Sequence, residues 1–485
     1  MLGDMNKGRT FRAAGAGLAV SAALAACGGG GGGGGAKGPS ALDPANMVPA
    51  SAVAYAEVAI KPQGSTRSDL IEAVNSIAGS GTAQSLDAKL DKSGGKVWKQ
   101  LQTWAGQQVG VALTTLPSRL SSSHDLTDDV VLVMPTNDPS AARSFLKKNM
   151  HQQSESWKVV GHYAIFGGTK AVDAAATTTA KTSLMADAGF KSDMDQLGSG
   201  ELFTAYLPLH ELYEQLLPLL KSLPQYAGTN SLSAGAKQAP PGSSIGLGMS
   251  ALHNQFRMDV VEHGVPHSSA PVSGVASDVS ALPASSWLAL TLGGALTKAG
   301  TVSKLAASVS NSITQLQAAQ GITGAKIPSG PLDFIVKDLL PALGPAELSV
   351  SGTSGTTLQA GLVMAPVNKG AGARLARAVR HLVSGLPIAA STTGGRVAVT
   401  FGFNSLQQLL NPSSKLAGNP SFKHALAQLP SGAKADLYLN FSGIAALAAL
   451  DPSAGNASAM RVLHRLDYLI AGGTHSHFRM VLTTY

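Results

Sequence analysis

The strongest constraint on the fold of this chain is an internal repeat, in which the sequence from Val48 resembles the sequence from Leu282. Each half opens with a Pro-Ala-Ser turn that leads into a short apolar run, Val53–Ile60 in the first half and Trp287–Leu292 in the second. A turn followed by such a run predicts a β-strand. A sequence that repeats over about 200 residues folds most simply into two similar domains.

Further matches follow in the same order along both halves, at offsets between 222 and 239 residues. The matched strands are Trp104–Val111 with Leu343–Val350, Val130–Pro135 with Ala360–Pro366, Trp157–Phe166 with Arg396–Phe403, Leu202–Leu207 with Ala435–Leu439, and Gln255–Met258 with His477–Met480. The matched helices are Ser140–Asn149 with Ala371–Leu382 and Leu209–Leu220 with Ile444–Leu450. This pattern predicts an α+β fold of two tandem duplicated domains, each a mostly antiparallel or mixed sheet with helices packed on one side.

Turn-forming composition places the boundaries of these domains. Residues 266–281 are rich in Pro, Gly and Ser, which is typical of a linker. We therefore predict a first repeat over residues 48–265 and a second over residues 282–485.

The N-terminus has the organisation of an export signal. Lys7, Arg9 and Arg12 precede the apolar stretch Ala13–Ala23, which is too short to span a bilayer. Leu24-Ala25-Ala26-Cys27 follows and resembles the lipobox of bacterial lipoprotein signal peptides. The resemblance implies that residues 1–26 are removed and that the Cys27 thiol carries a diacylglycerol. The alternative is an ordinary secretory signal with a chance cysteine after it.

A glycine-rich tether follows the cysteine. Gly28–Gly35 has no side chains to bury, and residues 27–47 are predicted to form the lipidated cysteine and its tether. A coil of this composition has an r.m.s. span of roughly 20–25 Å over the stretch before Pro44. The expected location is therefore the extracytoplasmic face of the cell membrane. Because Cys27 is the single cysteine, the mature chain can form no internal disulfide.

Composition excludes several classes of protein. Charged residues are 13% of the chain, against a usual figure of about 25%. The formal net charge of +8 becomes +6 once residues 1–26, with three basic residues and one acidic residue, are removed. This balance mildly favours anionic lipid headgroups or wall polymers as partners, but no Lys/Arg-rich run predicts nucleic-acid binding. A hydrophobic content of 44% is ample for a packed core.

Motifs for catalysis occur only in the wrong context. Ser244 lies in a Gly-x-Ser-x-Gly pattern, but Pro240-Pro241 precedes it where a nucleophile elbow needs a buried strand. Ser144 and Lys147 have the Ser-x-x-Lys spacing of penicillin-binding proteins without the later motifs of that class. We therefore predict no catalytic residues, no cofactor and no enzymatic activity.

Metal-binding patterns are weak. His475 and His477 alternate on a predicted strand and could ligate zinc or copper, with His464 as a third ligand. No Asp or Glu lies beside them, and the aligned segment of the first half has His253 and Gln255. Asp128 and Asp129 lack the spacing of a calcium loop. An exposed strand face and a solvated turn explain these residues equally well.

The opening of the body carries a resemblance to a known family. The stretch Pro49–Val58, with Tyr55 and Glu57 on its strand and with Pro62 after it, follows the lipobox and tether. In this arrangement the chain resembles the bacterial envelope proteins grouped as domain of unknown function 3352. The resemblance implies an exported or membrane-attached protein and no assigned activity, so it implies no functional residues.

The sequence leaves two classes of function open, with a third that is weaker. The first is a non-catalytic envelope lipoprotein that scaffolds or binds an envelope protein. The second is a carrier of a lipid or another apolar ligand, which the membrane tether and the apolar helices suggest. The third is an envelope hydrolase, which the absence of a convincing acid, base and nucleophile disfavours.

Overall fold

The computed structural model describes most of the chain after the tether. The described residues are 42–85, 95–116, 128–150, 155–221, 239–265, 278–292, 345–354, 357–366, 369–382, 388–402, 406–449 and 457–485. They form two compact units. The first comprises residues 1–267 with His475–Phe478, and the second comprises residues 268–474 with Arg479–Tyr485. Each unit is described by itself, and the fold of both is α+β.

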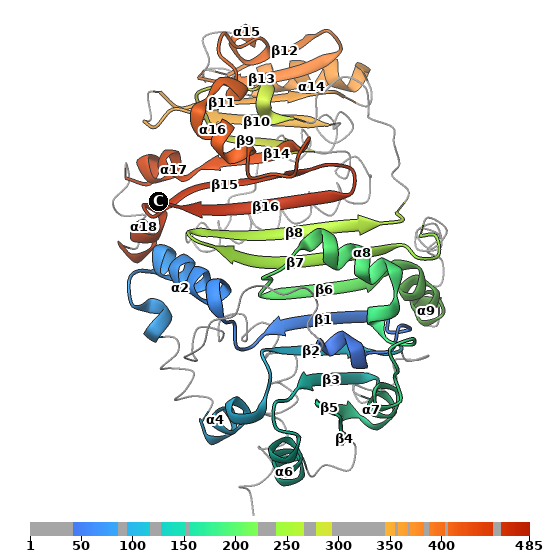
Figure 1. Ribbon diagram of the computed structural model, residues 1–485. Helices are drawn as coiled ribbons and strands as arrows, with labels where there is room; N and C mark the ends of the chain where they lie inside the picture. Colours follow the sequence, from blue (N-terminus) through green and yellow to red (C-terminus); the bar gives the residue numbers. More distant parts are fainter. Residues whose placement is uncertain are drawn as a thin grey trace, which may run out of the picture. The chain divides into compact units, whose positions relative to one another are not determined.

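The first unit is built on antiparallel strands in the order β8-β7-β6-β1-β2-β3-β5-β4 (Figure 1). These strands are β1 (Ala54–Ala59), β2 (Gln108–Leu113), β3 (Val130–Pro135), β4 (Glu155–Val160), β5 (Tyr163–Gly168), β6 (Phe203–Pro208), β7 (Ser244–Leu252) and β8 (Gln255–His263). Its helices are η1 (Pro44–Met47), α2 (Gly64–Ala78), α4 (Gly95–Trp104), α6 (Pro139–Asn149), α7 (Thr169–Ala176), η2 (Leu184–Ala186), α8 (Ala188–Leu197) and α9 (Leu209–Lys221).

The second unit has antiparallel strands in the order β12-β13-β11-β10-β9-β14-β15-β16. These strands are β9 (Ser286–Leu292), β10 (Ala346–Ser351), β11 (Gln359–Met364), β12 (Ile388–Thr393), β13 (Arg396–Phe401), β14 (Lys434–Asn440), β15 (Leu466–Gly473) and β16 (His477–Thr484). Its helices are η4 (Val279–Ala281), α14 (Lys369–Leu382), α15 (Leu406–Leu410), η7 (Leu416–Gly418), α16 (Pro420–Leu426), α17 (Phe441–Ala448) and α18 (Ala457–Leu463).

The strand order of one unit corresponds to that of the other. Starting from the first strand of each unit, β1, β2, β3, β5 and β4 follow one another across the sheet as β9, β10, β11, β13 and β12 do. On the other side of the first strand, β6, β7 and β8 correspond to β14, β15 and β16. The helices α6 and α14 also correspond, because each follows the third strand of its unit.

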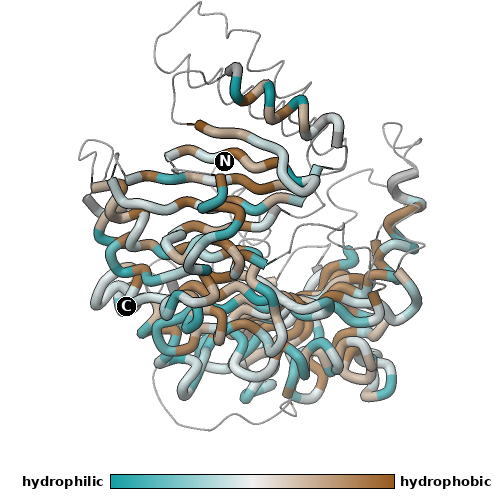
Figure 2. The backbone as a smooth tube through the Cα atoms, turned by 90° about the horizontal axis from the view of Figure 1, so that it is seen from above, coloured by the Kyte–Doolittle hydropathy of each residue, from teal (hydrophilic) through white to brown (hydrophobic). Residues whose placement is uncertain are grey.

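The prediction that helices pack on one side of each sheet is wrong, because both faces carry them. In the first unit Val131 and Val133 pack with α7, η2 and α8, whereas Met134 packs with α4 and α6. In the second unit Val363 packs with α16 and η7, whereas Met364 packs with α14. The reason lies in strands such as Val130–Pro135, which are apolar without a break and so need cover on both faces. Figure 2 shows hydrophobic residues, in brown, along the strands.

The segment expected as a single strand over Trp157–Phe166 is a hairpin of β4 and β5. Val160 pairs with Tyr163, which leaves Gly161 and His162 as a two-residue turn. Gly161 has a φ of 56°, in the left-handed region that glycine adopts without strain. The predicted break at Gly161 is therefore a chain reversal, and it doubles the number of strands in this segment.

Corresponding aromatic pairs pack in the two units. Phe190 of α8 meets Tyr206 of β6 edge to face, with ring centroids 5.2 Å apart and an interplanar angle of 88°. Phe422 of α16 meets Tyr438 of β14 at 5.2 Å and 89°. This geometry is favoured by the ring quadrupoles. The ring contacts hold α8 on β6 in the first unit and α16 on β14 in the second. These two strands occupy corresponding places in the strand orders.

Candidate functional site

A largely enclosed carboxyl group lies on the first strand of the first unit. The Tyr55 hydroxyl donates a hydrogen bond to Glu57 Oε2 at 2.7 Å. Asp43, which caps η1 by accepting from Ala45 N at 2.8 Å, places a second carboxyl nearby. Burial is the main cause that raises the pKa of Glu57 to about 8, and the charge of Asp43 adds to it. The hydrogen bond from Tyr55 opposes the shift. Glu57 therefore holds a proton at neutral pH.

A glycine lets the elements around Glu57 close together. Glu57 pairs with Gly110 across β1 and β2. A Cβ at Gly110 would lie 2.7 Å from Pro44 Cβ and 3.0 Å from the Tyr55 ring, which is closer than real contacts allow. Asn46 Nδ2 donates to the Tyr163 hydroxyl at 3.4 Å on the same side. The site is thus held between η1, β1, β2 and β5.

The second unit has an acidic pair in the corresponding place, but its glutamate comes from the neighbouring strand. Glu347 of β10 pairs with Thr291 of β9, where the first unit pairs Gly110 with Glu57. Glu347 is 6% exposed. Burial raises its pKa to about 7, with Arg396 opposing the shift and Asp278, the cap of η4, adding to it. Each unit therefore has, among its described residues, a glutamate whose pKa is raised by burial and by a capping aspartate.

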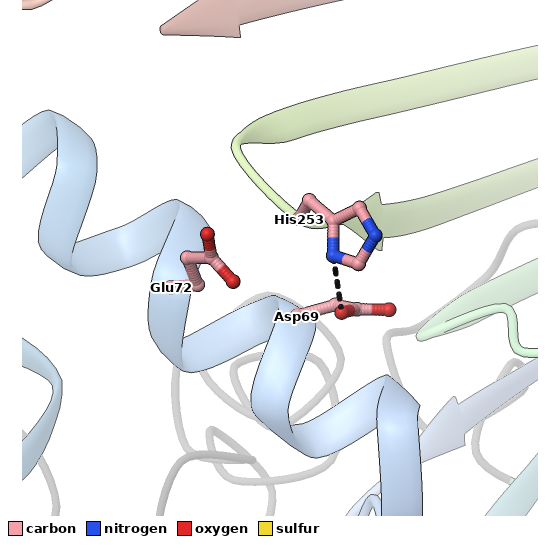
Figure 3. Close-up of side chains that lie close together, drawn as sticks. All are labelled: Asp69, Glu72 and His253. Atoms are coloured by element: carbon pink, nitrogen blue, oxygen red, sulfur yellow. Dashed lines mark ion pairs between the residues drawn. The ribbon is translucent and has the colours of Figure 1, made fainter. Parts of the chain in front are cut away.

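A second group of polar side chains lies between α2 and the β7–β8 hairpin (Figure 3). Asp69 and Glu72 stand one helical turn apart on α2, and His253 at the hairpin turn points toward them. Their donor atoms lie within 4.8 Å of one another, and His253 Nδ1 is 3.2 Å from Asp69 Oδ1. These donors are the types that zinc accepts. Glu72 and His253 are exposed, as in many solvated clusters, so the donor set alone does not define a metal centre.

The histidines considered from the sequence are placed differently. His477 Nε2 lies 2.6 Å from Asp259 Oδ1 in the first unit. Asp259, which is 1% exposed, is also 2.7 Å from the Arg257 guanidinium. Among the described residues, the metal-compatible group does not include His475 or His477. The sequence reasoning missed both the carboxylate beside His477 and the meeting of His253 with Asp69, because neither partner is close in the sequence.

The serine of the Gly-x-Ser-x-Gly pattern is inaccessible. Ser244 is fully buried at the start of β7, and its hydroxyl donates to Asp193 Oδ2 at 2.7 Å. Burial raises the pKa of Asp193 to about 6, which the hydrogen bond from Ser244 opposes. In a catalytic triad a histidine lies between serine and aspartate. Here the two are bonded directly, which joins β7 to α8.

The remaining residues considered from the sequence have ordinary surroundings or lie elsewhere. Ser144 and Lys147 are exposed on α6. Asp129 accepts from the Thr115 hydroxyl at 2.6 Å and pairs with Lys170 at 3.1 Å. Cys27 lies outside the described residues.

An apolar hollow of about 230 Å³ lies in the second unit. It is lined by Ser442, Ala445, Ala446, Ala449, Leu463, His464, Leu466 and Tyr485. Pockets for drug-sized ligands usually measure about 300–1,000 Å³. Neither acidic pair lines this hollow.

Comparisons with known proteins add little to this geometry. No protein-family model matches the chain, and no curated protein matches it significantly in sequence. A solved structure titled "Structure of crystal form I of TP0453" matches with 8% identity, covering 80% of this chain and 99% of that chain. Its TM-score of 0.14 is too low to indicate a shared fold.

Proposed function

We propose that this chain is a lipid-anchored protein of the bacterial cell envelope, with a non-catalytic body that binds or scaffolds another envelope component. The observation that carries the proposal is Cys27, the single cysteine, at the end of a lipobox and directly before the glycine tether. The proposed location is the extracytoplasmic face of the cell membrane. The resemblance to domain of unknown function 3352 belongs to this proposal.

The arrangement of potentially reactive groups agrees with a body that does no catalysis. Ser244 is buried and bonded to Asp193, and His477 is bonded to Asp259. General acid–base catalysis needs groups within reach of a substrate. The described helices include none with the length and apolarity to cross a membrane.

We further propose that the body arose by tandem duplication. The corresponding strand orders of the two units support this. The aromatic pairs Phe190–Tyr206 and Phe422–Tyr438, which have nearly the same separation and angle, support it as well. Tandem duplication also explains why each unit packs buried side chains on both faces of its sheet.

The anchor is tested by the mass and the location of the mature protein. The N-terminal peptide of the wild-type protein should begin at Cys27 and carry the mass of a diacylglycerol, and the protein should sediment with membranes. The Cys27→Ser variant should carry no lipid and should incorporate no labelled fatty acid. Ser40→Ala, within the tether but outside the lipobox, is the matched control and should behave as wild type. An unmodified Cys27 in the mature protein would overturn the proposal.

A further inference from the structure

Two corresponding helices present basic faces to solvent. Helix α14 carries Arg374, Arg377 and Arg380 at intervals of three residues, and all three are exposed. Residues three apart lie on one face of a helix. The opposite face, with Leu375 and Ala376, is buried against the sheet of the second unit. The three guanidinium groups therefore form a stripe that the packing of the helix does not require.

Helix α6 has the same character in the first unit. Arg143, Lys147 and Lys148 are exposed, whereas Phe145 and Leu146 are buried in the core beneath the helix. Lysines in the last turn also favour the helix dipole. That effect does not account for Arg143 in the first half of the helix.

Neither helix contains an acidic residue that could neutralise this charge. Within the part of the chain that the structure describes, none of the six basic side chains forms an ion pair, and Arg380 bonds only to the Ala376 carbonyl of its own helix. Surface charges in proteins are usually interspersed with the opposite sign. Two uncompensated basic faces at corresponding places are unexpected in a chain with 13% charged residues.

We infer that the basic faces of α6 and α14 bind anionic lipid headgroups at a membrane surface, an inference that rests on the lipid anchor proposed above. Guanidinium groups recognise phosphate by paired hydrogen bonds, and lysines add point charges. Clusters of basic side chains near an anionic membrane surface are attracted to it electrostatically. The proposed tether, with an r.m.s. span of roughly 20–25 Å, holds the body near that surface.

The test uses the mature chain, residues 27–485, with Cys27→Ser so that no lipid anchor contributes. Flotation with vesicles of phosphatidylcholine containing phosphatidylglycerol should recover the protein, and vesicles of phosphatidylcholine alone should not. The triple variants R374Q/R377Q/R380Q and R143Q/K147Q/K148Q should each weaken binding about tenfold or more. Raising the salt concentration should weaken wild-type binding, because exposed charges are screened.

The matched control removes three exposed charges elsewhere. Lys191, Lys415 and Lys423 lie on or beside α8, η7 and α16, which pack on the other faces of the sheets. K191Q/K415Q/K423Q should bind within twofold of wild type, and all variants should keep the wild-type melting temperature. If this control loses as much vesicle binding as the other two variants, the inference is overturned, because the net charge of the protein and not the two helix faces would then cause the binding. Binding to soluble polyphosphate in preference to vesicles would overturn it in favour of an anionic polymer.

This design separates the inference from the anchor. Vesicle binding is measured without a lipid on Cys27, and lipidation is measured by mass without vesicles. If the wild-type protein is lipidated but its unlipidated form does not bind vesicles with phosphatidylglycerol, the inference about α6 and α14 is wrong and the proposed function stands.

Discussion

At the scale of single residues, burial raises the pKa of the Glu57 carboxyl to about 8 and that of the Glu347 carboxyl to about 7, so each is neutral over part of the physiological range. The sequence contained one signal of their surroundings. Asp43 is an N-cap residue, and Pro44 follows it at the first helical position. This order is a typical signal of a helix start. It contained no signal that the capping aspartate would face a glutamate, because that meeting depends on the closure of η1 over β1 and β2.

We predict that Glu57→Gln raises the melting temperature by several degrees at pH 8. An acid whose pKa is raised in the folded state binds its proton more tightly there than in the unfolded chain. Its contribution to stability is therefore present below the ordinary pKa near 4.5, and it is lost as the pH rises to about 8. Glutamine stays neutral and can still accept from the Tyr55 hydroxyl.

Thermal unfolding between pH 4.5 and 8.5 provides the measurement. The gain of Glu57→Gln should shrink toward the acidic end of this range. Glu72→Gln on the exposed face of α2 is the control and should change the melting temperature little. A variant less stable than wild type at pH 8 would contradict the assignment of a proton to Glu57.

At the scale of elements, side-chain caps connect the helices α8 and α16 to their sheets. Asp187 accepts from Phe190 N at 2.7 Å and from the Tyr206 hydroxyl at 2.9 Å. Asn419 accepts from Phe422 N at 3.2 Å and donates to the Ala284 carbonyl at 2.9 Å. In both units the capping side chain thus forms one hydrogen bond to the first turn of its helix and another to a residue outside that helix.

We predict that Asp187→Ala and Asn419→Ala each lower the free energy of unfolding by about 1–2 kcal/mol, the upper range for loss of an N-cap. Both substitutions leave a backbone N–H without its acceptor. Urea denaturation followed by circular dichroism gives the value. Asp187→Asn retains the capping oxygen and should recover most of the loss, whereas Asn419→Asp retains the capping oxygen but loses the donor to the Ala284 carbonyl and should recover only part of it. Full destabilisation in these conservative variants would show that capping is not the cause.

The elements themselves were largely predictable. The expected helix Leu209–Leu220 is α9, and the expected helix Ser140–Asn149 is α6. Their apolar periodicity is local and survives in the fold. The two-sided cover of each sheet was not anticipated, because an apolar run does not say which partner will bury each face.

At the scale of the whole molecule, the open question is whether the body carries an apolar ligand. In the described residues of each unit, helices and buried side chains pack on both faces of the sheet. The apolar hollow beside α17 and α18 is about 230 Å³, below the usual size of a ligand site.

We predict that the unlipidated mature chain, purified without detergent, contains far less than one lipid molecule per chain. Solvent extraction followed by mass spectrometry provides the measurement. Headgroup contact at α6 and α14 does not alter the expectation, because such binding is reversible and leaves acyl chains in the membrane. A lipid recovered in stoichiometric amount would favour the carrier alternative over the scaffold.

The sequence by itself determined elements such as α6, α9 and β3, because turns, capping residues and apolar periodicity act between residues a few positions apart. It also carries the stretch Leu24-Ala25-Ala26-Cys27, on which the proposed lipid anchor rests and which needs no fold to be read. Only the tertiary structure decided that the charge of Asp43 acts on Glu57, that His253 meets Asp69, and that His477 pairs with Asp259. These contacts join residues on separate elements, so they arise from strand pairing and packing, which local patterns do not specify.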